Sequence, residues 1–242
     1  MGVERTMRAQ GFHHTPHEED VAGFLNRRRV VQAYSVTQDV HQEVASRFAA
    51  ERLGRILDLG CGEGVLGRLL AGSAVRWTGL DRSTGLLERA PAPKVRGDAV
   101  ALPLVDGTFD GVAALYMLYR LDEPRLAIAE AHRVLRPGGI FAAATPSRFD
   151  APELADLLPQ ERSTFDAELA PELIGEVFEQ VEVQAWDGPY VHLPDVQALG
   201  RYLAAYGVPP ERAGLVAETH RDRVPLALTK RGALVYARKP GR

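Results

Sequence analysis

The 242-residue sequence lacks a second cysteine, a long hydrophobic run and an excess of basic side chains. Its single cysteine, Cys61, excludes an intramolecular disulfide, so we expect a reducing location such as the cytoplasm. No apolar stretch approaches the ~20 residues that a transmembrane helix needs, and residues 1–20 lack the apolar core of a signal peptide. We therefore expect neither a membrane partner nor an export signal.

The charge balance argues against a nucleic-acid partner. Asp and Glu outnumber Lys and Arg by 32 to 29, and 7% of the residues are aromatic. Proteins that bind nucleic acid through its phosphates usually carry a basic face, and those that recognise unpaired bases stack aromatic side chains on them. We therefore expect no nucleic acid to be bound.

Histidines gather in the first 20 residues, at His13, His14 and His17. They lack cysteine and carboxylate partners at the spacing of metal ligands, so we expect no metal site. This polar segment fits either a solvated tail or a flap that orders over a bound ligand.

The pattern of apolar residues predicts an N-terminal helical cap followed by an α/β domain. Two helices are predicted between residues 21 and 52, separated near 34–37, where a hydroxyl side chain can cap the second. From residue 53 onward, strands alternate with helices, as in a doubly wound, mostly parallel sheet. Strands are predicted at 55–59, 75–80, 94–96, 109–115, 139–144, 179–186 and 226–237, and helices at 65–71, 83–90, 123–135, 172–177, 194–206 and 210–220.

We thus expect a Rossmann-like domain over residues 53–242, with a seven-stranded sheet and an antiparallel edge strand, preceded by the tail and cap of residues 1–52. The last strand region, at 226–237, is expected to be a strand pair or one long strand, interrupted by a turn signal at 230–232. Residues 146–172 form a long connection after the fifth strand. We expect them to be a helical insertion that shapes a binding pocket.

A glycine-rich loop follows the first predicted strand, with glycines at Gly60, Gly62 and Gly64. Glycine permits a positive φ and a close approach of a ligand, and the N-terminus of the next helix faces the same space. The loop suits a nucleotide-like ligand. Residues 62–67 also satisfy the dinucleotide fingerprint G-x-G-x-x-G, so a nicotinamide-dependent oxidoreductase has to be considered.

Three carboxylates near strand ends help to distinguish these cofactors. Asp81 ends the second strand and can accept hydrogen bonds from ribose hydroxyls with either cofactor. Asp58 lies at the end of the first strand and Asp98 follows the third, and a buried carboxylate needs a donor partner. An ammonium and an adenine amine supply such donors, whereas a pyrophosphate would add negative charge beside Asp58.

Five motifs occur together in the order and at the spacing of one family. They are ILDLGCGEG at 56–64, GLDRS at 79–83, GDA at 97–99, FDGV at 109–112 and LRPGG at 135–139. The sequence therefore resembles the class I S-adenosylmethionine-dependent methyltransferases over residues 53–145. It is most similar to their small-molecule branch, which includes ubiquinone and menaquinone methyltransferases. The resemblance implies S-adenosylmethionine as the cofactor.

The resemblance also implies how the cofactor is held. Asp58 and the backbone of Gly60 would hold the methionine ammonium, partly through water, and Gly62 would allow close approach. Asp81 would bind the ribose. The remaining contacts would come from Arg82 beside the adenine, Asp98 at the adenine amine, the Ala99 N–H at a ring nitrogen and the Leu115 backbone at the methionyl end. In this family the aspartate of the FDGV motif, Asp110, mostly braces the sheet.

Candidate acceptor residues lie on segments expected to cover the carboxyl ends of the strands. Where this family often carries a histidine pair after strand four, the sequence has tyrosines, so we expect Tyr116 and Tyr119 to line the pocket or to pack. The candidate general base is His192, and Tyr34 is a second catalytic candidate. Other candidates to contact the acceptor are Arg148, Asp150 and Tyr190.

Methyl transfer from a sulfonium is an in-line displacement, which requires alignment more than acid–base chemistry. A base is needed only when the acceptor must lose a proton early. The sequence therefore favours methyl transfer to O, N or C of a small organic molecule by a monomer or homodimer. An RNA or protein methyltransferase, a nicotinamide-dependent oxidoreductase and a protein that binds the cofactor without using it remain the alternatives.

Overall fold

The computed structural model describes residues 21–35, 39–159 and 163–241. The histidine-rich segment of residues 1–20, for which the sequence suggested a tail or a flap, lies outside the described residues. Residues 36–38 also lie outside the described residues, and they include part of the stretch at 34–37 where a hydroxyl cap was expected. The observed cap of the second helix is Asp39, whose side chain accepts a hydrogen bond from the backbone N–H of His41.

The predicted seven-stranded, mostly parallel sheet is confirmed. Its strand order is β3-β2-β1-β4-β5-β7-β6, with β7 antiparallel to both of its neighbours and one place in from the edge. The strands are β1 (Arg55–Leu59), β2 (Arg76–Asp81), β3 (Lys94–Arg96), β4 (Phe109–Leu115), β5 (Leu135–Pro146), β6 (Gln180–Leu193) and β7 (Leu226–Arg238).

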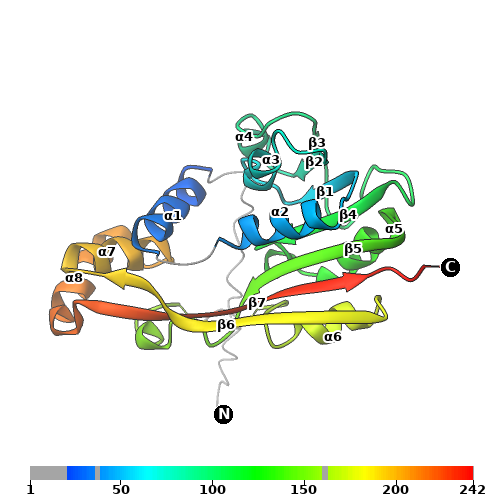
Figure 1. Ribbon diagram of the computed structural model, residues 1–242. Coiled ribbons are helices and arrows are strands. Elements are labelled where there is room, and N and C mark those ends of the chain that lie inside the picture. The colour runs from blue at the N-terminus through cyan, green and yellow to red at the C-terminus, as the bar shows by residue number, and fades with distance from the viewer. Residues whose placement is uncertain (1–20, 36–38, 160–162, 242) are drawn as a thin grey trace, which may run out of the picture.

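Helices cover both faces of this sheet, as Figure 1 shows. Apolar side chains of α2, α3 and α4 pack on one face with Ile56, and those of α5 and α6 pack on the other with Leu57 and Leu59. The central strand β4 is buried along its whole length, as expected for a strand between two helical layers. The helices are α1 (Val21–Tyr34), α2 (Val40–Ala50), α3 (Val65–Leu69), α4 (Thr84–Leu87), α5 (Pro124–Val134), α6 (Ala170–Gly175), α7 (Val196–Ala205) and α8 (Pro210–Thr219).

A buried carboxylate fixes the start of the central strand. Asp110 is 7% exposed, and its Oδ2 accepts hydrogen bonds from the backbone N–H groups of Gly54 at 2.7 Å and Arg55 at 2.8 Å. Its Oδ1 forms an ion pair with Arg136 at 2.7 Å. Asp110 therefore braces the sheet, as the sequence suggested, at the edge opposite the glycine loop.

The last two strands run without interruption through segments where the sequence suggested a turn or a loop. The turn expected at residues 230–232 is wrong and the alternative of one long strand is confirmed, because β7 pairs with β6 without interruption across Gly232. This glycine serves packing: a Cβ there would lie 2.2 Å from Cζ2 of Trp186. The strand β6 likewise continues to Leu193, so residues 187–193 are strand where the sequence suggested a loop.

These long strands carry a second apolar cluster at one end of the molecule. In Figure 1 the far ends of β6 and β7 reach α7 and α8, and α1 lies beside α7. Buried Leu199, Leu203 and Leu228 form the centre of this cluster. The expected insertion at 146–172 contributes little helix in its described part, only a short 3₁₀ turn, η2 (Pro152–Leu154), and the start of α6. The pocket that residues 146–172 were expected to shape is therefore lined more by β6 and β7 than by that insertion.

Candidate active site

A cavity of 1290 Å³ lies at the carboxyl ends of β1, β2 and β4. The connections that follow β1, β2, β3, β4 and β5 line it, as do α1, the start of α2 and the inner sides of β6 and β7. Pockets for one small ligand usually measure about 300–1,000 Å³. The cavity therefore has room for a nucleoside cofactor together with a second small molecule.

The glycine loop forms one wall of the cavity. The backbone has positive φ at Gly60 (62°), Gly62 (55°) and Gly64 (75°), a conformation that side chains other than glycine rarely adopt. At Gly60 a Cβ would also lie 2.8 Å from Cβ of Met117, whereas at Gly62 it would meet only the ring of Phe24, at 3.7 Å. The loop thus presents bare backbone to the cavity, as the sequence predicted.

Asp81 holds the glycine loop and faces the cavity at the same time. Its Oδ2 accepts from the Gly62 N–H at 2.8 Å, and its Oδ1 accepts from the Ser83 N–H at 2.9 Å. A carboxylate can accept about four hydrogen bonds, so each oxygen keeps one acceptor position. Two such positions on one carboxylate suit the two hydroxyls of a ribose.

The other predicted cofactor residues lie on the same side of the cavity. Asp98 and Ala99 follow β3, and the Asp98 carboxylate accepts from the Val100 N–H at 3.2 Å. Arg82 is exposed at the rim, and Leu115 ends β4. This side also carries Glu63, which forms ion pairs with Arg28 and Arg68. Asp81 and Asp98 therefore supply the negative charge that favours a cationic cofactor over a pyrophosphate.

Asp58 lies beneath this wall and does not line the cavity. It is 4% exposed, and the Trp77 indole donates to its Oδ2 at 3.1 Å. Burial raises the pKa of Asp58 to about 7, although the nearby His41 and the bond from Trp77 oppose the shift. The predicted contact of Asp58 with an ammonium therefore needs an intermediate such as water, and it stays a prediction.

The raised pKa of Asp58 makes the stability of the ligand-free protein depend on pH. A carboxyl whose pKa is raised by folding stabilises the protein below its ordinary pKa of 3.8, and this contribution is lost as the pH rises through about 7. Asp58→Asn keeps an acceptor for Trp77 without the charge. We expect the variant to unfold with a free energy about 1–2 kcal/mol higher than the wild type near pH 8 and little different near pH 5. Urea titrations at both values measure this, and parallel curves would contradict it.

The opposite side of the cavity is rich in tyrosine. Tyr116 follows β4 with a φ of 58°, which is uncommon for a residue other than glycine and marks a conformation that the surrounding structure imposes. Its N–H bonds to the Ala144 carbonyl at 2.8 Å. Burial raises the pKa of Tyr116 above its ordinary value, so its phenol stays neutral and can donate a hydrogen bond.

The predicted acceptor residues divide into two groups. Tyr116, Tyr119 and Tyr190 line the cavity, and the Tyr119 hydroxyl accepts from an Nη of Arg120 at 3.1 Å. The structure does not bring Arg148 to the cavity. Instead its guanidinium bonds to Asp166 at 2.9 Å. Asp150, which follows the same strand, lines the cavity in its place.

Neither predicted catalytic residue reaches the cavity. His192 is exposed on β6, where its neighbours Val191 and Leu193 are buried, so strand alternation directs its side chain away from them. Tyr34 packs against the cluster around α7, where its hydroxyl lies 3.5 Å from an Nη of Arg201. The expected position of His192 is wrong because residues 187–193 are part of β6 and not a loop.

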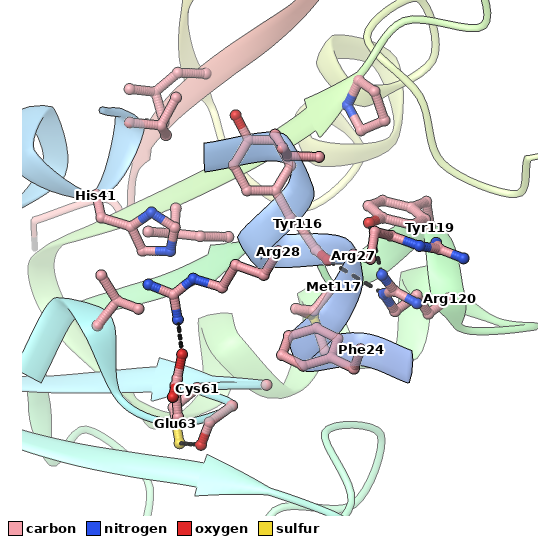
Figure 2. A pocket seen from close by; sticks show the side chains of 18 of the residues that line it. Phe24, Arg27, Arg28, His41, Cys61, Glu63, Tyr116, Met117, Tyr119 and Arg120 are labelled. Atoms are coloured by element: carbon pink, nitrogen blue, oxygen red, sulfur yellow. Dashed lines mark hydrogen bonds and ion pairs between the residues drawn. The ribbon is translucent and has the colours of Figure 1, made fainter. Parts of the chain in front are cut away.

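The histidine that does line the cavity is His41, at the start of α2. Its Nδ1 lies 3.2 Å from Oδ1 of Asp39, and its ring centroid lies 6.2 Å from that of Tyr116. The hydrogen bond with His41 lowers the pKa of Asp39. Figure 2 shows His41 and Tyr116 on the same side of the pocket. A local sign of this position is the pair Asp39 and His41 at the start of a helix.

A polar cluster that was not predicted from the sequence lies at the end of the cavity away from the glycine loop. Lys230 forms an ion pair with Asp150, and the Tyr202 hydroxyl lies 3.3 Å from its Nζ. The Tyr206 ring stacks on that of Tyr202 with centroids 4.5 Å apart. Lys230, Asp150 and Tyr206 all line the cavity. These residues come from three segments that are distant in the sequence, so no local pattern of residues predicts the cluster.

Two searches of the described residues bear on other predictions. Among residues 21–35, 39–159 and 163–241, no three His, Cys, Asp or Glu side chains are grouped so that they could hold a metal ion. No helix in the same part of the chain combines the length and the apolar character needed to cross a membrane.

Comparisons with known proteins agree with this geometry. Residues 57–143 match a family model described as a methyltransferase domain. The chain is 30% identical over 188 residues to the malonyl-[acyl-carrier protein] O-methyltransferase of Pseudescherichia vulneris, with 73% of each chain covered. It is 33% identical over 129 residues to the demethylmenaquinone methyltransferase of Renibacterium salmoninarum, with 48% of this chain and 54% of that one covered. The chain spans under half the length of other curated relatives, 44% of one and 45% of another.

A likeness to solved structures confirms the fold. The crystal structure of the [4+2]-cyclase SpnF superposes with a TM-score of 0.59 at 22% identity, over 94% of this chain and 98% of that one. Because that protein is a cyclase by its name, the fold alone does not establish the reaction. The assignment to the methyltransferases therefore rests on the sequence relatives and on the residues of the cofactor wall.

Proposed function

Since the chain belongs to the class I S-adenosylmethionine-dependent methyltransferases, we propose that it transfers the methyl group to an O, N or C atom of a small organic acceptor. The observation that carries the proposal is the form of the cavity. One side is the carboxylate-rich cofactor wall, and the other is lined by tyrosines and covered by α1, β6 and β7. A covered chamber of this kind suits a small acceptor better than a polymer strand.

The residues on the cofactor wall fit S-adenosylmethionine. The two free acceptor positions on Asp81 match the ribose, the bare backbone of Gly62 allows close approach, and Asp98 with Ala99 offers an acceptor and a donor to the adenine. When bound, the cofactor supplies an activated methyl group on a positively charged sulfur. The protein therefore has to orient the acceptor and exclude water.

The tyrosine side of the cavity would supply that orientation. Tyr116 remains a neutral donor at physiological pH, and the rings of Tyr119 and Tyr190 offer flat apolar surfaces. For an acceptor that must lose a proton, His41 is the histidine of the cavity wall, and Asp39 would orient its imidazole through Nδ1. This role replaces the one that the sequence suggested for His192.

The names of two relatives are consistent with acceptors of modest size. One is named for demethylmenaquinone and the other for a malonyl group on a carrier protein. A carrier-bound acceptor would extend only its end into the chamber, so it remains compatible with the cavity. The cofactor wall disfavours the nicotinamide alternative, because a pyrophosphate would lie near the carboxylates of Asp81 and Asp98.

Calorimetry and product analysis test the proposed function in two steps. We expect S-adenosylhomocysteine to bind with micromolar or tighter affinity and NADH to show no saturable binding. S-adenosylmethionine should then be converted to S-adenosylhomocysteine with at least one acceptor from a panel of phenols, carboxylic acids and amines. Salt-dependent binding of RNA, or methylation only of amino-acid side chains in proteins, would overturn the small-acceptor proposal.

A further inference from the structure

Two neighbouring arginines on α1 point to different parts of the cavity. Successive residues of a helix are rotated by about 100°. Arg28 forms an ion pair with Glu63 on the glycine loop, as Figure 2 shows. Arg27 instead donates from Nε to the Ala205 carbonyl at 2.6 Å, and its Cζ lies 5.7 Å from the centre of the Tyr206 ring. Arg28 therefore belongs to the cofactor side, and Arg27 to the far, acceptor side.

The charges on these two sides are balanced differently. Arg28 is neutralised by Glu63, and Lys230 by Asp150. Within the described ranges, no carboxylate forms an ion pair with Arg27, whose one recorded hydrogen bond uses Nε. Its two terminal nitrogens are the part of the guanidinium that binds carboxylates in a bidentate fashion. Arg27 is half-buried and lines the cavity, so a free cation faces the acceptor side.

The surroundings of Arg27 reinforce this positive end. Lys230 lies 5.3 Å from the centre of the same Tyr206 ring, so this tyrosine stands next to two cations. The single carboxylate recorded on Lys230, Asp150, also accepts from the Arg231 N–H at 2.8 Å, which fixes its position. The cluster of Arg27, Lys230 and Asp150 thus carries one positive charge in excess, in a partly buried place where charge is screened little.

We propose that the acceptor carries a carboxylate, or a similar acidic group, which binds Arg27 beside Tyr206 while the atom to be methylated faces the cofactor. This inference rests on the proposed function and names the class of its substrate. The cofactor also has a carboxylate, on its methionyl end. We assign Arg27 to the acceptor because its contacts are with Ala205 and Tyr206, and because Arg28 occupies the side of the glycine loop.

A matched pair of probes tests the charge preference directly. The protein saturated with S-adenosylhomocysteine is titrated at neutral pH with 4-hydroxybenzoate and, separately, with 4-hydroxybenzamide, which has the same shape without the charge. We expect the acid to bind at least about 10-fold more tightly than the amide, the usual size of a charge-assisted hydrogen-bond pair. Equal affinities, or no saturable binding of the acid, would overturn the proposal.

Variants of α1 locate the effect. Arg27→Met should remove the preference for the acid, and Arg27→Lys should keep part of it because the charge remains. Arg29→Met is the matched control, since Arg29 is exposed on the same helix and does not line the cavity. It should leave both affinities unchanged. An acid preference that survives Arg27→Met would contradict the assignment, and circular dichroism checks that each variant is folded.

A second titration separates the two possible carboxylates. S-adenosylhomocysteine has a homocysteinyl carboxylate, which corresponds to the methionyl carboxylate of the cofactor, and 5′-methylthioadenosine lacks it. We expect Arg27→Met to bind both nucleosides as the wild type does. If it loses affinity for S-adenosylhomocysteine alone, Arg27 binds the cofactor, and the proposal is wrong although the methyltransferase function stands. Failure of the wild type to bind either nucleoside would instead refute the function itself.

Discussion

Asp81→Ala is expected to weaken the binding of S-adenosylhomocysteine by about 1–3 kcal/mol, or roughly 5- to 150-fold in the dissociation constant. The variant loses the acceptor positions assigned to the ribose. It also leaves the N–H groups of Gly62 and Ser83 without the carboxylate that holds them at 2.8 Å and 2.9 Å. Isothermal titration calorimetry measures the change.

A deoxy analogue separates the ribose contact from the support of the loop. If Asp81 binds the ribose, 2′-deoxy-S-adenosylhomocysteine should bind the wild type more weakly than the parent compound, and Asp81→Ala should discriminate far less between the two. Asp81→Asn keeps one oxygen acceptor and should lie between the wild type and the alanine variant. Undiminished affinity in a folded Asp81→Ala protein would refute the ribose assignment.

The largest effect on stability is expected for Asp110→Ala. The substitution leaves the part-buried N–H groups of Gly54 and Arg55 without their acceptor, and each such loss costs about 1–2 kcal/mol. The ion pair with Arg136 adds little, because the Arg136 side chain is 56% exposed. We expect the free energy of unfolding to fall by about 2–4 kcal/mol in urea titration.

The chain offers a matched control for this substitution. Asp106 also accepts from an arginine, Arg133, at 2.5 Å, but its side chain is 74% exposed and holds no recorded backbone N–H group. Asp106→Ala should therefore change the free energy of unfolding by less than about 1 kcal/mol. Comparable losses in the two variants would show that Asp110 acts through its ion pair and not through the strand start.

The cofactor side of the cavity was predictable because its residues are close in sequence to strand ends. Parallel strands bring their carboxyl ends to one edge, so Gly62, Asp81 and Asp98 had to meet once the strand order was known. The role of Asp110 followed in the same way. The sequence could not show that Asp58 accepts a hydrogen bond from the Trp77 indole, because that contact depends on how β1 and β2 pack under α3.

The acceptor side was less predictable for a physical reason. Tyr206, Lys230 and Asp150 meet because the paired strands β6 and β7 extend beyond the end of β5, and α7 follows β6 there. The glycine at 232, which indicated a turn, instead gives room to the Trp186 ring. The segment ending at His192 was taken for a loop because its polar residues alternate on the exposed side of a long strand.

The sequence by itself determined the sheet, the glycine loop and the class of cofactor, because each depends on local spacing that a parallel α/β fold brings to one edge. Only the tertiary structure decided which side chains line the rest of the cavity. It places His41 and Arg27 in the lining, and His192, Tyr34 and Arg148 outside it. These positions depend on contacts between distant segments, which no short pattern of residues encodes.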